Sequence, residues 1–214
     1  MRADDRPLIA ILDYGIGNLH SAQKGFSHAG ADARLTSDPG LIADAVGVVL
    51  PGVGAFEPCM RALRTTGLDA VALERIESDV PFFGICVGMQ VLFAGSVEAP
   101  GVEGLGVIDR HVSLIPDNVK RPQMQWNILQ RRVTDHAMFT DLPEQAWVYF
   151  VHSYSAADGS DVIATCDYGA DLVAAVARQN LWAAQFHPEK SGDNGIRILG
   201  NFVAMAAAHG ERLR

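Results

Sequence analysis

Cysteine and basic residues are scarce in this sequence. Three cysteines occur among 214 residues, and their spacing fits neither a disulfide framework nor a zinc site. A reducing compartment is therefore expected. Lys and Arg number 17 against 25 Asp and Glu, so the formal net charge is −8. That balance argues against a surface devoted to nucleic acid or anionic lipid.

Long apolar runs and low-complexity tracts are also missing. No apolar run reaches the roughly 20 residues that cross a bilayer, and residues 1–6 lack the apolar core of a signal peptide. With 21 Gly, 10 Pro and 49% hydrophobic residues, the composition excludes a fibrous or disordered chain. We expect a cytoplasmic protein with a single domain over residues 1–214, of which residues 1–6 are flexible.

Short apolar runs alternate with helical patterns in the first half of the chain. Strands are predicted at residues 8–12, 31–36, 46–50 and 80–85, with helices at 19–29, 59–64 and 68–77 between them. This alternation favours an α/β fold with a parallel sheet covered on both faces. The second half is richer in strands, predicted at 106–114, 128–133, 147–151, 162–166, 172–176 and 181–185, before a last helix at 195–208.

One glycine-flanked cysteine follows a predicted strand. Cys86 lies in the sequence GICVG (residues 84–88), and a helical pattern begins at Met89. This is the cysteine form of a nucleophile elbow, in which a sharp strand-to-helix turn exposes the nucleophile. The helix N-terminus favours the thiolate, and the Val87 amide would face a substrate carbonyl. The alternative is a small buried hydrophobe, which we prefer for Cys59 and Cys166.

A cysteine nucleophile needs a general base and a group that orients it. Among seven histidines, His187 follows the apolar run 181–185, and Pro188 stiffens the turn that carries Glu189. His187 is therefore the leading base and Glu189 its orienter, although an ordinary surface turn is the alternative. The other histidines are interpreted as solvated or locally satisfied residues, except His152, which ends the apolar strand 147–151.

Another glycine turn follows the predicted strand 46–50. The sequence PGVG (residues 51–54) can present backbone amides to an anionic oxygen, or it can be a plain tight turn. It lacks the Gly-Lys-Ser/Thr of a phosphate-binding loop, and residues 15–18 lack the third glycine of a dinucleotide fingerprint. In open parallel sheets, ligands bind beyond the carboxyl ends of the strands. Residues 13–18, 51–54 and 84–90 all lie at such ends.

Taken together, these motifs resemble the class I (triad) glutamine amidotransferases. More narrowly, the chain is similar to the glutaminase subunits of imidazole glycerol phosphate synthases. The matching segments run in family order: DYGIGN (13–18), LPGVGAF (50–56), GICVGMQ (84–90), YFVHSY (149–154) and FHPEKSG (186–192). Met89 separates the chain from the anthranilate and aminodeoxychorismate amidotransferases, which usually have His there. One segment departs from the family: Pro-His-Met-Gly-Trp-Asn is replaced by PQMQWN (122–127), with Gln123 and Gln125 altering a loop that the family places near its partner.

The resemblance implies three layers, a mostly parallel central sheet with helices on both faces, and a more antiparallel, strand-rich second half. It implies hydrolysis of glutamine to glutamate and ammonia by Cys86, His187 and Glu189. It also implies residues for three further roles, and no metal or cofactor. The oxyanion is held by Gly52, Val53 and Val87; glutamine is bound by Gln90, Glu98, Ser153 and Tyr154; the partner interface contains Asn18, Trp126, Asn127, Tyr149 and Lys190.

The implied partner is a (β/α)8-barrel cyclase in a heterodimer. It uses the ammonia to make imidazole glycerol phosphate and an aminoimidazole carboxamide ribonucleotide, in histidine biosynthesis. A barrel needs about 250 residues, so this chain does not encode it. Two alternatives stay open: an amidotransferase subunit of another synthase, such as anthranilate synthase, and a non-catalytic regulatory module that keeps the cysteine elbow.

Overall fold

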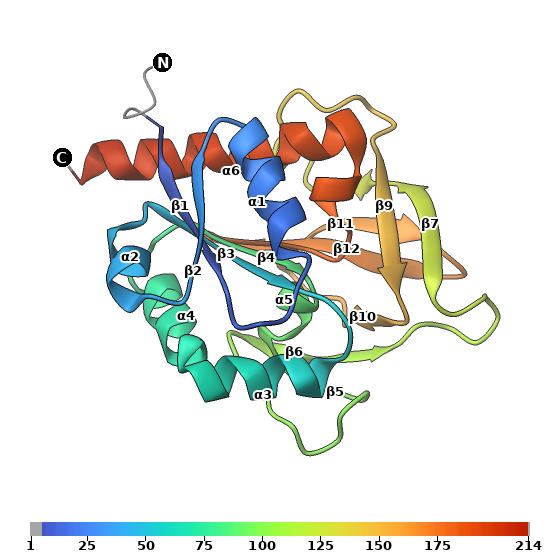
Figure 1. Cartoon of the computed structure of the whole chain (residues 1–214). Coiled ribbons are helices and arrows are strands. Elements are labelled where there is room, and N and C mark those ends of the chain that lie inside the picture. The colour runs from blue at the N-terminus through green and yellow to red at the C-terminus, as the bar shows by residue number, and fades with distance from the viewer. Residues whose placement is uncertain (1–5, 214) are drawn as a thin grey trace.

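The computed structural model describes residues 6–213, and its centre is an eight-stranded sheet (Figure 1). Five neighbouring strands are parallel, and the last three are antiparallel. The predicted parallel sheet with a more antiparallel second half is therefore confirmed. In spatial order the strands are β2 (Asp32–Thr36), β1 (Leu8–Leu12), β3 (Gly47–Gly52), β4 (Phe82–Cys86), β13 (Leu181–Ala184), β12 (Asp171–Arg178), β11 (Val162–Asp167) and β8 (Gln130–Arg131).

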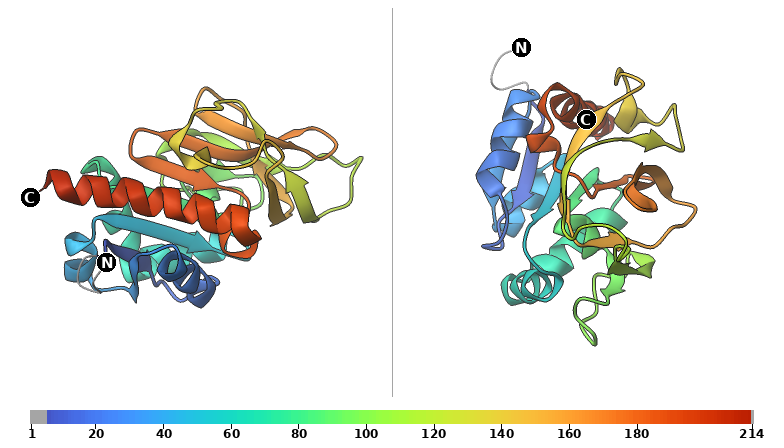
Figure 2. Two further views of the ribbon diagram at one scale, coloured as in Figure 1. Left: turned by 90° about the horizontal axis from the view of Figure 1, so that it is seen from above. Right: turned by 90° about the vertical axis from the view of Figure 1, so that its right-hand side faces the viewer.

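Helices cover both faces of this sheet, as Figures 1 and 2 show. On one face lie α1 (Leu19–His28) and α6 (Gly192–Arg212); on the other lie α3 (Phe56–Thr66) and α4 (Leu68–Glu77). Phe83 of β4 contacts Phe26 and Phe202, with ring centroids 6.4 and 5.3 Å apart. Burial of each such ring contributes roughly 1.5–3 kcal/mol, so these contacts stabilise the packing of α1 and α6 on β4.

Two smaller sheets flank the central one. The first contains β5 (Phe93–Ser96), β6 (Ile108–Leu114) and β10 (Tyr154–Ala156). The second is a ribbon of two antiparallel strands, β7 (Gln123–Ile128) and β9 (Trp147–His152). In Figure 1 this ribbon stands beside the central sheet, at the edge toward which β3 and β4 run.

The predicted elements differ from the structure in two places. The helix after Cys86 is only the short α5 (Val87–Gln90), because the chain turns into β5 instead of continuing the helical pattern. The strand predicted at 128–133 is observed only in part: β7 ends at Ile128, and the two residues of β8 follow. β7 exposes its middle residues, so it lacks the apolar alternation on which the prediction depended.

A short helix and two strands were also not predicted. The helix is α2 (Pro39–Asp44), which Asp38 caps by accepting hydrogen bonds from the amides of Gly40 and Leu41. An N-cap aspartate followed by proline is a readable start signal, so this helix could have been found. β5 and β10 are each four residues or fewer, too short for a periodic pattern.

The topology brings the predicted functional turns to one edge of the central sheet. β1, β3, β4 and β13 are parallel, so their carboxyl ends lie together. The turns after β1, β3 and β4 contain the three glycine-rich segments, and the chain after β13 leads to His187. Within residues 6–213, no helix combines the length and apolarity needed to span a membrane.

Candidate active site

The nucleophile elbow is present at the end of β4. Cys86 has φ 56° and ψ −113°, a conformation that non-glycine residues rarely adopt. A Cβ on Gly88 would lie 1.8 Å from the carbonyl oxygen of Leu50, and one on Gly84 would lie 2.8 Å from that of Gly88. The flanking glycines are therefore required by close backbone packing of β3, β4 and α5. This close packing agrees with the sharp strand-to-helix turn predicted from the glycines around Cys86.

His187 and Glu189 lie together beside this elbow. The Nδ1 of His187 is 2.8 Å from Oε1 of Glu189, and both side chains are almost fully buried. The loop that carries them is fixed at both ends, because the His187 amide donates to the carbonyl of Tyr149 and the Ser191 hydroxyl donates to that of His187. Glu189 belongs to the short 3-10 helix η3 (Pro188–Lys190) that Pro188 begins. The predicted rigid His-Pro-Glu turn is thus the geometry observed.

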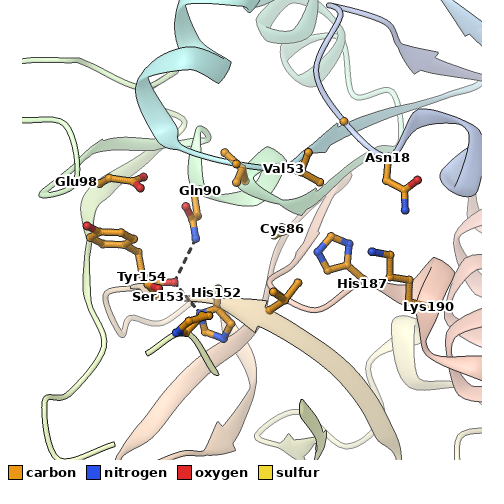
Figure 3. A pocket seen from close by; sticks show the side chains of 15 residues that line it. Asn18, Val53, Cys86, Gln90, Glu98, His152, Ser153, Tyr154, His187 and Lys190 are labelled. Carbon is orange, nitrogen blue, oxygen red and sulfur yellow. Dashed lines mark hydrogen bonds between the residues drawn. The ribbon is translucent and has the colours of Figure 1, made fainter. Parts of the chain in front are cut away.

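The environment of His187 favours the protonated imidazolium. Burial on its own lowers the pKa of His187, but hydrogen bonds with Cys86 and Glu189 outweigh it and raise that pKa to about 10. His187 is therefore protonated at neutral pH. Its Nδ1–H donates to Glu189, which leaves the other ring nitrogen for the sulfur of Cys86 (Figure 3).

A cavity of about 610 Å³ opens over Cys86. Figure 3 shows Gln90, Glu98 and Tyr154 on one side of Cys86, and Asn18, His187 and Lys190 on the other. Most of the predicted site residues share this cavity, although the strands and loops that carry them are far apart in sequence. The predicted residues that line it are Asn18, Val53, Cys86, Val87, Gln90, Glu98, Ser153, Tyr154, His187 and Lys190.

Five predicted residues lie outside this lining. Glu189 stands behind His187, and Gly52 lies beneath Val53 at a smaller neighbouring void. Trp126 and Tyr149 form an edge-to-face pair across the β7–β9 ribbon, with ring centroids 6.1 Å apart. Asn127 donates its side-chain amide to the carbonyl of Asp167. The last three therefore lie on the ribbon beside the cavity.

Glu98 has a structural contact as well as a place in the cavity. Its Oε2 accepts a hydrogen bond from the amide of Phe56, the first residue of α3, at 2.9 Å. A carboxylate there satisfies one of the free amides at the helix N-terminus. The second oxygen of Glu98 remains for a ligand in the cavity.

Gln185 is a residue to which the sequence assigned no role. It is completely buried, and its side-chain amide donates to the sulfur of Cys86 at 3.7 Å while its Oε1 accepts from Gln90 at 2.9 Å. Gln90 also donates to the carbonyl of Tyr154 at 3.2 Å. One polar chain thus joins Cys86 to the side of the cavity that Gln90 and Tyr154 line. The sequence did contain a signal for this role: Gln185 directly follows an apolar strand, and a buried polar side chain needs hydrogen-bond partners.

His152 lines the cavity and has an open ring nitrogen. Its Nδ1 donates to the carbonyl of Tyr154 at 2.8 Å, and its Nε2 is buried without a hydrogen-bond partner among residues 6–213. Burial and the nearby His187 lower the pKa of His152 to about 4. His152 is therefore neutral at physiological pH, with Nε2 available as an acceptor. In the described part of the chain no cluster of His, Cys, Asp or Glu could hold a metal ion.

The family model for class-I glutamine amidotransferases matches residues 10–206. The chain belongs to this family. Within it, the chain is 47% identical to the imidazole glycerol phosphate synthase subunit HisH of Synechococcus sp. (strain JA-3-3Ab), covering 93% of this chain and 94% of that protein. It is 46% identical to the HisH subunit of Methanothermobacter thermautotrophicus, covering 94% and 100%. The resemblance expected from the motifs is confirmed at both levels.

Solved structures of amidotransferases share the fold. A putative GMP synthase subunit from Thermoplasma acidophilum matches with a TM-score of 0.72 and 20% identity, over 97% of this chain and 98% of that one. The structure of PurLQS from Thermotoga maritima matches with a TM-score of 0.71 and 17% identity, over 98% and 100%. Because the sequence identity is 20% or less, these structures show only that the fold is shared.

Proposed function

We propose that this chain is the glutaminase subunit of an imidazole glycerol phosphate synthase. The observation that carries the proposal is a buried Cys86–His187–Glu189 arrangement at the floor of a cavity, in a chain 42–47% identical to several HisH subunits. The reaction is hydrolysis of the side-chain amide of glutamine to glutamate and ammonia.

The proposed chemistry is acyl transfer through Cys86. Its thiolate attacks the amide carbon of glutamine, and the amides of Val87 and of the Gly52–Val53 turn stabilise the oxyanion. His187 gives its proton to the departing ammonia, which leaves a glutamyl thioester on the sulfur. The neutral His187 then takes a proton from water as the water attacks the thioester, and free glutamate and thiolate result. Glu189 holds the imidazole in place throughout.

The other side of the cavity is proposed to bind the α-amino and α-carboxylate groups of glutamine. Gln90, the free oxygen of Glu98, and the Ser153–Tyr154 backbone surround that space (Figure 3). His152 is proposed to add an acceptor, because it lines the cavity and its Nε2 has no hydrogen-bond partner among residues 6–213. A polar atom buried without a partner costs about 1–3 kcal/mol, and a bound ammonium or amide would remove that cost.

The partner is proposed to be a (β/α)8-barrel cyclase that receives the ammonia. Ammonia released into water is protonated and diluted, so its transfer needs a closed path between the two subunits. Asn18 and Lys190 lie on the far side of Cys86 from the glutamine-binding groups, where the leaving ammonia would depart (Figure 3). Trp126, which is 47% exposed, stands with Tyr149 and Asn127 on the neighbouring β7–β9 ribbon. Exposed aromatic side chains of this kind anchor protein interfaces.

The two unusual glutamines of β7 lie in different environments. Gln123 is fully buried and contacts the sulfur of Cys166 at 3.7 Å, so it replaces a family histidine inside the protein. Gln125 is exposed on the ribbon. Of the two changes, Gln125 is the one that would alter docking of the cyclase.

The test is a glutaminase assay of the wild type and of Cys86→Ala, each alone and with the cyclase of the same organism. We expect low activity alone, a rise with the cyclase and its nucleotide ligand, and no activity for Cys86→Ala. Equal turnover with and without the partner would refute the coupling. Stimulation by an anthranilate synthase component instead would assign the chain to another synthase, and an inactive wild type in every pairing would favour a regulatory module.

A further inference from the structure

Two buried side chains lie directly behind the oxyanion turn and have no part in the mechanism above. Tyr14 follows β1, and Cys59 lies in α3; they are 4% and 0% exposed. The Tyr14 hydroxyl donates to the carbonyl of Pro51 at 2.6 Å, and the Cys59 thiol donates to the carbonyl of Val53 at 3.4 Å. The two side chains also contact each other.

These contacts involve two alternate peptide groups of the turn. The carbonyl of Pro51 belongs to the peptide before Gly52, and the carbonyl of Val53 belongs to the peptide after Val53. The Gly52–Val53 peptide lies between them and is held by neither side chain. That middle peptide carries the Val53 amide, one of the donors assigned to the oxyanion.

The turn is packed too tightly to be oriented by its own side chains. A Cβ on Gly52 would lie 2.6 Å from the amide nitrogen of Gly88 and 3.0 Å from the Tyr14 hydroxyl. Glycine is therefore required where β3 approaches the elbow. Because glycine places few limits on its own backbone angles, the direction of the middle peptide must be set by its neighbours.

We propose that Tyr14 and Cys59 are positioning residues that hold the peptides on both sides of the Gly52–Val53 peptide and so aim the Val53 amide at the reacting carbonyl. The inference rests on the proposed glutaminase function and adds two residues to it. Neither side chain lines the cavity over Cys86, so both act through the backbone of the turn.

The protonation of both groups suits this role. Burial raises the pKa of Tyr14 far above its ordinary value, and burial likewise raises the pKa of the Cys59 thiol. Both groups therefore keep their protons at neutral pH and remain donors. Cys86 instead contacts His187, so the two cysteines have different partners.

The test separates oxyanion stabilisation from formation of the thiolate. Tyr14→Phe and Cys59→Ala are compared with the wild type in complex with the cyclase, for kcat and KM with glutamine and for the rate of alkylation of Cys86 by iodoacetamide. Alkylation forms a carbon–sulfur bond with loss of iodide and develops no oxyanion. It therefore depends on the thiolate but not on the turn.

We expect kcat to fall about tenfold in each variant, since removing a whole oxyanion donor costs roughly 10²–10³-fold, with KM and the alkylation rate within twofold of the wild type. The double variant falls no further than about the worse single variant, because the pair acts on one peptide. Tyr168→Phe is the matched control: its hydroxyl donates to the carbonyl of Lys120 at 2.8 Å on the surface, and its kcat stays unchanged.

Several results would overturn the inference. Unchanged or higher kcat in both variants would show that the pair does not aim the turn. A parallel loss of kcat and alkylation rate would show damage to the elbow itself, which is a structural role. Failure of the proposed function looks different, since the wild type would then release no ammonia from glutamine in any pairing.

Discussion

The floor of the cavity, formed by Cys86 with the adjoining β3 and α5, differs in burial and packing from the β7–β9 ribbon beside it. The floor is buried and packed at backbone distance: Cys86 is 4% exposed, and α5 lies against β3 with no room for one methyl group at Gly88. The ribbon exposes large apolar side chains, with Met124 60%, Trp126 47% and Trp147 46% accessible. The floor contains the residues proposed for the chemistry, whereas the ribbon is the surface proposed to bind the cyclase.

Two histidines repeat this contrast within the cavity. His187 has a carboxylate on one nitrogen and a thiol at the other, and its pKa is raised; His152 has a carbonyl on one nitrogen and nothing on the other, and its pKa is lowered. The same type of side chain is thus protonated at His187 and is a neutral hydrogen-bond acceptor at His152. The difference comes from the partners that each ring meets, not from burial, which both share.

The largest effect is expected from removing the negative charge of Glu189, which lies behind His187. Glu189→Gln keeps the shape of the side chain but loses the carboxylate that orients and stabilises the His187 imidazolium. We expect kcat for glutamine hydrolysis to fall on the order of 10⁴-fold, as for the third member of other triads. Glu57→Gln, an exposed carboxylate on α3, is the control and keeps wild-type kcat. Similar kcat values for the two variants would remove Glu189 from the mechanism.

The next effect tests whether backbone packing defines the floor. Gly88→Ala forces a Cβ to within 1.8 Å of the Leu50 oxygen, so α5 or β3 must move. We expect kcat to fall about 10²-fold and the free energy of unfolding to drop by about 3 kcal/mol, measured by urea denaturation.

Gly200→Ala in α6 is the matched control, because its Cβ would meet nothing within 4 Å. It should be neutral or slightly stabilising, since alanine favours a helix over glycine by up to about 1 kcal/mol. Wild-type turnover in Gly88→Ala would contradict the account of the floor.

A smaller effect tests the ribbon as a docking surface. Trp126→Ala removes an exposed aromatic anchor, and we expect the Kd for the cyclase to rise about 30-fold, equivalent to roughly 2 kcal/mol. Titration calorimetry measures this. Val97→Ala removes an apolar side chain that is 53% exposed on a different loop, and it should bind as the wild type does. Equal affinities for the two variants would move the interface away from β7.

The smallest effect concerns His152 and pH. Its pKa is about 4 in the folded chain against an ordinary value of 6.5, so below pH 6.5 the unfolded chain takes up a proton that the folded chain refuses. Stability from this residue is therefore present above pH 6.5 and is lost as pH falls toward 4, by about 2 kcal/mol between pH 7 and pH 5. His152→Gln should reduce the wild-type loss by that amount in urea denaturation. An identical pH dependence would mean that His152 is not a buried neutral ring.

The sequence predicted the floor better than the ribbon, for a physical reason. Cys86, His187 and Glu189 are signalled by short-range rules: glycines where side chains collide, and a proline that stiffens a turn. Gln185 and His152 act through partners that only the fold supplies, so local pattern gave Gln185 no role and His152 only a place at a strand end. β7 was missed because its middle residues are exposed and lack the alternation of a half-buried strand.

The central claim is that Cys86 forms a glutamyl thioester. The most direct measurement is mass spectrometry of peptides after the wild-type complex has been mixed with glutamine and quenched in acid. We predict a glutamyl adduct on the peptide that contains Cys86, and unmodified peptides for Cys59 and Cys166. Ammonia release with no adduct on Cys86, or with the adduct on another cysteine, would contradict the account.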